Sequence, residues 1–187
     1  MPKRSLRQQM LVLRRCLDVV GYQTASLRAQ RALLATAEFG RATVLALYAP
    51  LHNETDTSLI LATALATGKK VLYPVVTGST LEFRQVSSAT DLHAGAFGIR
   101  EPGAGCPELA IGEADIIVVP GVAYDVAGHR IGYGKGYYDK ALHQLEGRGR
   151  LVGFCFDFQL VEGLKEEPHD VRMDLIITDR RVIRPRD

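Results

Sequence analysis

The feature that most constrains the fold is a series of short, continuous apolar runs. The clearest are Thr43–Tyr48 (TVLALY), Lys70–Val76 (KVLYPVV) and Asp115–Val119 (DIIVV). Such runs do not alternate apolar with polar residues, which is typical of strands that are covered on both faces. A helical segment at Thr57–Thr67, closed by Gly68, separates the first two runs. The sequence therefore predicts a β-α-β unit early in the chain.

The rest of the chain continues this alternation. Further helices are predicted at Ser5–Val20, Ala25–Phe39 and about Gly136–Leu145, and further strands at Leu81–Val86, Leu151–Phe156 and Leu175–Thr178. Pro74 is expected to end its strand. We therefore expect an α/β fold, an open and mostly parallel sheet flanked by helices. No linker interrupts the 187 residues, so residues 1–187 are expected to form one domain.

Composition and charge exclude several classes of protein. Hydrophobic residues make up 47% and charged residues 24%, which is ordinary for a globular domain. A net charge of +2 gives no reason to expect nucleic-acid binding, and no apolar segment approaches the ~20 residues of a membrane span. Cys16, Cys106 and Cys155 form no CxxC motif, so we expect reduced thiols in a cytoplasmic protein. We separately expect a monomer or weak dimer.

The first predicted helix has a basic face. At ~100° per residue, Arg7 and Arg14 lie nearly on one line, with Arg4 close by. Residues 1–41 hold eight Lys or Arg against two acidic residues, a balance of +6 in a chain whose net charge is +2. This asymmetry indicates a local anion site; the alternative is a basic face exposed to solvent.

The segment after Asp115–Val119 lies where ligands bind in open α/β sheets, beyond the carboxyl end of a strand. It contains the glycine-rich sequence Gly132-Tyr-Gly-Lys-Gly-Tyr-Tyr-Asp139. Alternate glycines let backbone N–H groups approach an anion closely, and the start of a helix at Gly136 favours phosphate. Lys135 and Arg130 add full positive charges. The alternative is a tight turn with Lys135 in solvent.

Three further features of this segment bear on ligands. Asp139 is placed in the first helical turn, where it would hold a magnesium ion that bridges phosphate oxygens. The rings of Tyr133, Tyr137 and Tyr138 would stack on a flat heterocycle, with ordinary packing as the alternative. The spacing matches neither a Walker A loop nor GxGxxG.

No histidine pair has zinc-ligand spacing, and His169 is expected to be structural.

Together these motifs strongly resemble the 5-formyltetrahydrofolate cyclo-ligase family. The resemblance rests on the glycine-rich segment and on four others, Lys3-Arg4-Ser5-Leu6-Arg7, Glu54-Thr55-Asp56-Thr57, Gly98-Ile99-Arg100-Glu101-Pro102 and Pro168-His169-Asp170-Val171-Arg172-Met173-Asp174. It implies a ligase that uses ATP and Mg²⁺ to cyclise 5-formyltetrahydrofolate to 5,10-methenyltetrahydrofolate. The γ-phosphoryl group would pass to the formyl oxygen, N10 would attack, and ADP and phosphate would be released.

The resemblance also implies roles for individual residues. Lys135 and Arg130 would be catalytic. The ATP-binding residues would be Lys3, Arg4, Arg7, Arg130, Ile131, Gly132, Tyr133, Gly134, Lys135, Gly136, Tyr137 and Tyr138. Glu54, Tyr133 and Tyr137 would bind the folate, and Asp139 and Asp174 the magnesium ion. For Glu54 the alternative is a helix cap, and for Asp174 a residue that enters a strand.

Two other functions stay open at this point. A non-catalytic protein that binds folate or nucleotide would keep the same loop and release no ADP. A sugar-phosphate isomerase would also use a glycine-rich loop after a strand, but it would leave the basic first helix unexplained.

Overall fold

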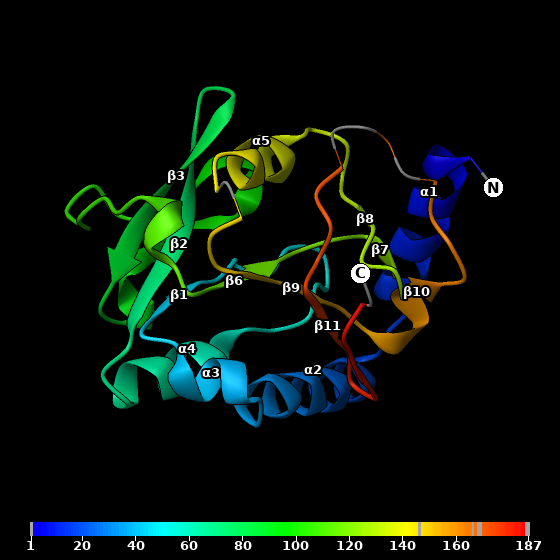
Figure 1. Cartoon of the computed structure of the whole chain (residues 1–187), viewed down its shortest axis with the longest axis horizontal. Coiled ribbons are helices and arrows are strands. Elements are labelled where there is room, and N and C mark those ends of the chain that lie inside the picture. The colour runs from blue at the N-terminus through cyan, green and yellow to red at the C-terminus, as the bar shows by residue number, and fades with distance from the viewer. Residues whose placement is uncertain (1, 146, 166, 168–169, 186–187) are drawn as a thin grey trace.

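The protein folds around a central sheet, seen in a computed structural model that describes residues 2–145, 147–165, 167 and 170–185 (Figure 1). The helices are α1 (Lys3–Arg15), α2 (Val19–Leu34), α3 (Ala37–Arg41), α4 (Ser58–Ala66) and α5 (Tyr137–His143). The strands are β1 (Val44–Ala46), β2 (Lys70–Thr77), β3 (Thr80–Val86), β4 (Leu92–Ala94), β5 (Arg100–Pro102), β6 (Ile116–Val119), β7 (Ala123–Asp125), β8 (Arg130–Ile131), β9 (Arg150–Phe154), β10 (Leu160–Val161), β11 (Leu175–Ile177) and β12 (Val182–Ile183).

The main sheet has the strand order β12-β11-β9-β6-β1-β2-β3. Its five inner strands run parallel, and the strands at both edges, β12 and β3, are antiparallel to their neighbours. The α/β class and the mostly parallel sheet predicted from the apolar runs are confirmed. Parallel strands place their carboxyl ends at one edge, so the loops that follow β1 and β6 lie side by side.

Both faces of the sheet are covered, as the apolar runs require. Ile116 and Val118 of β6 belong to a core shared with α2 and α4, whereas Ile117 and Val119 belong to a core shared with α5. This alternation follows from the two-residue period of a strand. Helices α2, α3 and α4 lie along one face and α5 on the other (Figure 1).

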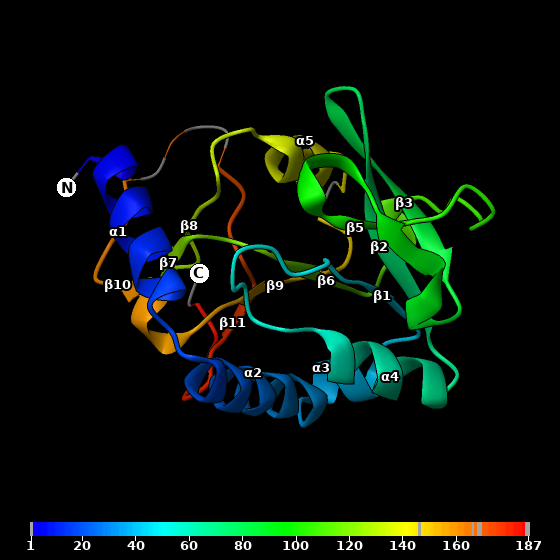
Figure 2. The same ribbon diagram turned by 180° about the vertical axis from the view of Figure 1, so that it is seen from behind.

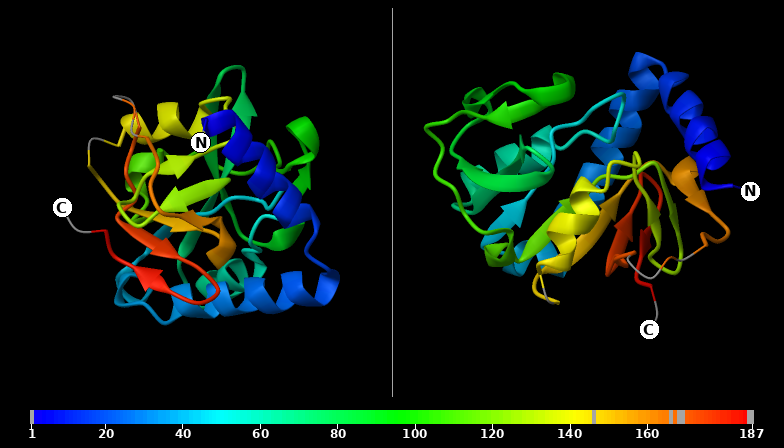
Figure 3. Two further views of the ribbon diagram at one scale, coloured as in Figure 1. Left: turned by 90° about the vertical axis from the view of Figure 1, so that its right-hand side faces the viewer. Right: turned by 90° about the horizontal axis from the view of Figure 1, so that it is seen from above.

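Helix α1 does not join the layer formed by α2–α4. It packs on a second, three-stranded sheet of order β10-β7-β8, through a small core that contains Met10, Val122, Ala123 and Ile131. Figure 2 and Figure 3 show α1 beside this small sheet, at the opposite end of the molecule from the β2–β3 hairpin. Within the described residues, no helix combines the length and apolar character that crossing a bilayer needs.

The structure corrects the boundaries of the first two helices. The helix expected over Ser5–Val20 ends at Arg15, because Asp18 caps a new helix by accepting a 2.6 Å hydrogen bond from the Gly21 N–H. The helix expected over Ala25–Phe39 divides in the same way. The Thr36 side chain accepts from the Phe39 N–H at 3.2 Å and starts α3.

Pro74 does not end its strand. It pairs with Phe83 inside the antiparallel ladder of β2 and β3, and β2 continues to Thr77. The parallel pairing of β2 with β1 stops at Leu72. The carbonyl of Leu72 accepts from the N–H of Leu47, on the β1 side, and the two-residue period of a strand turns the nitrogen of Pro74 to that same side. Pro74 lies beyond the last residue paired with β1, so its missing N–H removes no hydrogen bond from the sheet.

Candidate active site

A cavity of about 690 Å³ opens at the carboxyl ends of β1, β2 and β6. Segments far apart in the chain line it. They are Lys3 and Arg7 of α1, the loop residues Tyr48, Ala49, Leu51, His52 and Glu54, the hairpin residues Pro74, Val76 and Leu81, the turn residues Phe97, Ile99 and Glu101, Pro120, the stretch from Arg130 to Lys140, and His143, Glu167 and Asp170. All the predicted site residues except Arg4 and Asp174 are among them.

One part of the cavity is rich in positive charge. The side chain of Arg130 is 5% exposed, donates a 3.2 Å hydrogen bond to the carbonyl of Pro120 and forms an ion pair with Asp139. Lys135 is exposed, and its Nζ lies 3.3 Å from the centre of the Phe97 ring. The Nε of Arg7 donates to the carbonyl of Gly132 at 2.8 Å, which ties α1 to the glycine-rich segment. This part of the cavity suits a polyanion.

Glycines at two points of this segment are required by the backbone. Gly134 and Gly136 have φ values of 96° and 71°, in the left-handed region that side chains disfavour. Gly136 is the residue before α5.

Another part of the cavity presents a buried carboxylate. The hydroxyl of Tyr133 donates to Glu54 Oε1 at 2.9 Å, and the N–H of Leu51 donates to Glu54 Oε2 at 2.9 Å. Nη1 of Arg14 lies 3.8 Å from Glu54 Oε1. Glu54 therefore does not act as a simple helix cap, because its carboxylate bonds to groups outside α4.

Burial shifts the pKa values of both Glu54 and Tyr133. Loss of water contact raises the pKa of the Glu54 carboxyl, although the positive charge of Arg14 opposes the shift. Burial and the neighbouring carboxylate also raise the pKa of the Tyr133 phenol, so its proton stays in place and points at Glu54. A carboxylate held in this way accepts hydrogen bonds from a ligand with paired N–H donors.

Two predicted residues lie elsewhere. Arg4 is exposed and does not line the cavity, although at ~100° per residue its side chain lies only ~60° around α1 from that of Arg7. Asp174 directly precedes β11, at the edge of the sheet opposite the cavity. Its carboxylate accepts a 2.7 Å hydrogen bond from the N–H of Leu151. Asp174 thus enters a strand, and the expectation that it shares a magnesium ion with Asp139 is corrected.

The carboxylates that line the cavity indicate which kind of metal site it could form. No group of three or more His, Cys, Asp or Glu side chains within the described residues is arranged to hold a metal ion. Asp139, with a side chain that is 33% exposed, lies in the positively charged part of the cavity, where it pairs with Arg130. Mg²⁺ is commonly held by one or two carboxylates together with substrate phosphates. Asp139 fits that pattern, because its single carboxylate would hold a Mg²⁺ ion jointly with phosphates. His169 lies outside the described residues.

Sequence reasoning missed two residues of this region. Arg14 was recognised only as part of a basic face, whereas it is completely buried behind Glu54 and Tyr133. Its position on the same line of the helix as Arg7 was the available signal. Phe97 lines the cavity with φ of 59°. The position of this aromatic residue next to Gly98 was its only signal.

Comparisons with known proteins agree on one group of relatives. Residues 1–179 match the family described as the 5-formyltetrahydrofolate cyclo-ligase family. The 5-formyltetrahydrofolate cyclo-ligase of Mycolicibacterium smegmatis is 36% identical over 143 residues, which cover 73% of each chain. The solved 5,10-methenyltetrahydrofolate synthetase of Aquifex aeolicus superposes with a TM-score of 0.89 at 35% identity, over 100% of this chain and 94% of that one. The Mycoplasma pneumoniae synthetase gives 0.79 at 26% identity, over 96% and 99%.

Proposed function

This chain belongs to the 5-formyltetrahydrofolate cyclo-ligase family and is a ligase, and on that premise we propose that it couples ATP to the cyclisation of 5-formyltetrahydrofolate. The observation that carries the proposal is a cavity lined by five cations, Lys3, Arg7, Arg130, Lys135 and Lys140, and by a buried carboxylate, Glu54. A sugar-phosphate isomerase would leave the two cations of α1 unexplained, and a non-catalytic binding protein would keep the same cavity but release no ADP. A cytoplasmic location and a monomer or weak dimer stay predictions.

The chemistry needs an activated formyl oxygen. The γ-phosphoryl group of ATP moves to that oxygen, which releases ADP and leaves an iminium phosphate. N10 then attacks the formyl carbon and releases its proton to solvent, the carbon–oxygen bond breaks, and phosphate departs with the oxygen. In such a transfer the protein mainly positions the reactants and neutralises charge.

The cations divide this work between them. Lys135 is on the glycine-rich segment and is exposed to the cavity, which suits the charge that develops on the transferred phosphoryl group. Arg130 is held by Pro120 and Asp139, so its guanidinium is a fixed positive charge beside the same segment. Lys3 and Arg7 contribute from α1. Mg²⁺, held by Asp139 together with the phosphates, would supply further neutralisation of charge.

The folate is assigned to the other part of the cavity. The Glu54 carboxylate would accept hydrogen bonds from the amino and ring N–H groups of the pterin, and Tyr133 and Tyr137 would line its ring. Because Glu54 is buried, these hydrogen bonds would form in a site with little competing water.

One spectroscopic assay tests the proposal. Purified protein is mixed with 5-formyltetrahydrofolate, Mg²⁺ and ATP, and the near-ultraviolet absorbance of the methenyl product is followed. Parallel samples omit ATP, omit the protein or contain EDTA. We expect a rise that requires both protein and ATP, with one ADP released per product. No rise from folded protein that binds ATP would contradict the proposed reaction.

A further inference from the structure

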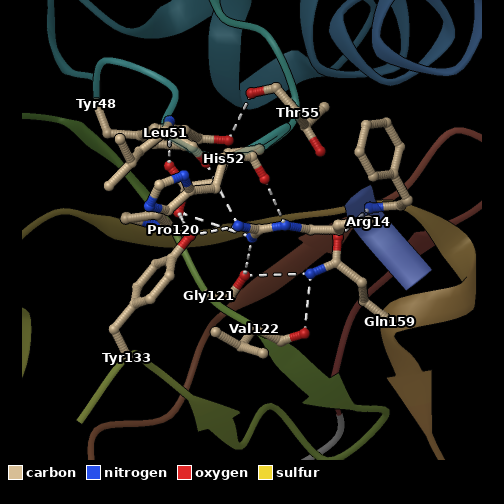
Figure 4. A network of polar contacts seen from close by, with 12 residues as sticks. Arg14, Tyr48, Leu51, His52, Thr55, Pro120, Gly121, Val122, Tyr133 and Gln159 are labelled. Carbon is tan, nitrogen blue, oxygen red and sulfur yellow. Dashed lines mark hydrogen bonds and ion pairs between the residues drawn. The ribbon is translucent and has the colours of Figure 1, made fainter. Parts of the chain in front are cut away.

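Arg14 is a charged side chain with no exposure to solvent. Its guanidinium donates to three backbone carbonyls, those of His52 at 3.2 Å, Leu51 at 3.3 Å and Gly121 at 3.4 Å. Figure 4 shows it pointing between these carbonyls from α1. Two loops, one after β1 and one after β6, are thus fastened to a single side chain of the first helix.

The same guanidinium reaches the cavity only through other residues. It donates from Nη2 to the hydroxyl oxygen of Tyr133, and that hydroxyl donates in turn to Glu54. Tyr133 and Glu54 line the cavity, whereas Arg14 does not. Arg14 therefore acts on a ligand by fixing two groups that touch it.

The loop that carries Glu54 has an unfavourable backbone. His52 and Asn53 are consecutive residues other than glycine with left-handed φ values of 50° and 57°. Such conformations cost of order 1–3 kcal/mol each and persist where surrounding contacts impose them. Arg14 supplies such contacts through both its side chain and its backbone. Its guanidinium donates to the His52 carbonyl, and its backbone carbonyl accepts a 3.1 Å hydrogen bond from the Asn53 side chain.

We propose that Arg14 is the positioning residue for the folate part of the site, holding the strained turn so that the Glu54 carboxylate and the Tyr133 hydroxyl face the cavity together. This inference rests on the proposed function, which assigns Glu54 to the folate. It separates two roles on one helix: Lys3 and Arg7 serve the nucleotide, and Arg14, two turns further along, serves the folate.

The test compares three variants. Arg14→Met removes the guanidinium, Arg14→Lys keeps only the charge, and Arg15→Met removes the neighbouring exposed arginine as a control. For each, KM is measured for 5-formyltetrahydrofolate and for ATP. We expect Arg14→Met to raise the folate KM about tenfold to a hundredfold, the range for a lost hydrogen bond to a charged group. The ATP KM should change less than about twofold, and the control should match the wild type in both.

Chemical rescue gives a readout that a general loss of stability would not move. Arg14→Ala leaves a guanidinium-shaped space, so free guanidinium ion at a non-denaturing concentration should lower its folate KM, whereas ammonium ion should not. Arg14→Lys should bind folate less well than the wild type, because an ammonium group cannot reach several carbonyls and Tyr133 at once. If Arg14→Met does not fold, these two variants decide the question.

Equal losses in both KM values, or an unchanged folate KM, would overturn the inference while leaving the proposed reaction intact. Failure of the wild-type assay would instead refute the proposed function. In that case amide hydrogen exchange in residues 51–54 still tests the positioning role. Faster exchange confined to this turn in Arg14→Lys would support it, and unchanged exchange would overturn it.

Discussion

The role proposed for Glu54 needs a negative charge, whereas its buried surroundings disfavour one. Its carboxyl has a pKa above the ordinary value of 4.5 because of its burial, with Arg14 working in the opposite direction. On acidification Glu54 therefore gains its proton at a higher pH than an exposed glutamate does. A protonated carboxyl keeps one acceptor oxygen fewer for the N–H donors of a pterin.

The pH dependence of folate use should show this directly. We expect kcat/KM for 5-formyltetrahydrofolate, at saturating ATP, to fall on the acid side with a midpoint above pH 4.5. Glu54→Gln cannot ionise, so its lower kcat/KM should lack that decline. The ratio of wild type to variant at each pH cancels the titration of both substrates. A constant ratio across the range would mean that the titrating group lies elsewhere.

In the proposed mechanism Lys135 is the second residue whose charge the reaction needs. Lys135→Met should lower kcat by about 10²–10³-fold, the loss seen when one group that stabilises transition-state charge is removed. The folded structure should survive, because the side chain is exposed. Lys70→Met removes an exposed lysine at the start of β2, at the other edge of the sheet, and serves as the control. Normal turnover in Lys135→Met would remove this residue from the mechanism.

At the scale of elements, side-chain caps decide where the N-terminal helices divide. Hydrophobic spacing alone runs on from Leu13 to Leu17 and predicts one long helix. The local hydrogen bond of Asp18 ends that register and redirects the chain into α2. This redirection leaves α1 free to pack on the small sheet rather than in the helical layer.

The cap makes a measurable contribution to stability. Asp18→Ala should lower the free energy of unfolding by about 1 kcal/mol, because the first N–H groups of α2 lose an acceptor. Asp18→Asn retains an acceptor oxygen and should stay within a few tenths of a kcal/mol of the wild type. Urea denaturation of both variants measures the difference. Equal stability of all three proteins would show that the break between the helices has another cause.

How much of the fold the sequence predicts depends on whether an element has a repeated hydrophobic pattern. The strand β6 was evident because four consecutive buried apolar residues leave few alternatives. Strands β7, β8 and β10 were missed because each has two or three residues and no repeated pattern. The glycine-rich segment and Glu54 were singled out from motifs, whereas the place of Asp174 depends on the direction of its strand, because a residue before a parallel strand lies at the amino ends of the sheet.

At the scale of the whole molecule, the cavity joins two chemically different parts without a resident metal site in the described ranges. Metal removal should therefore separate activity from stability. We expect EDTA to abolish turnover, since Mg²⁺ is held together with the phosphates of ATP, and to leave the Tm of the ligand-free protein unchanged. Added Mg²⁺ should restore turnover fully. A fall in Tm with EDTA would reveal a structural metal that this arrangement does not provide for.

The ion pairs of Lys3, in the part of the cavity proposed for the nucleotide, join segments that are far apart in the chain. Lys3 Nζ lies 3.0 Å from Glu167 and 3.3 Å from Asp170, which is 167 positions later. Contacts of such high sequence separation form slowly, because a long loop must close first. During synthesis the ribosome makes Lys3 first and its acidic partners only near the end. Assembly of this part of the cavity is therefore a late step of folding, and ATP binding would report that a newly made chain has completed it.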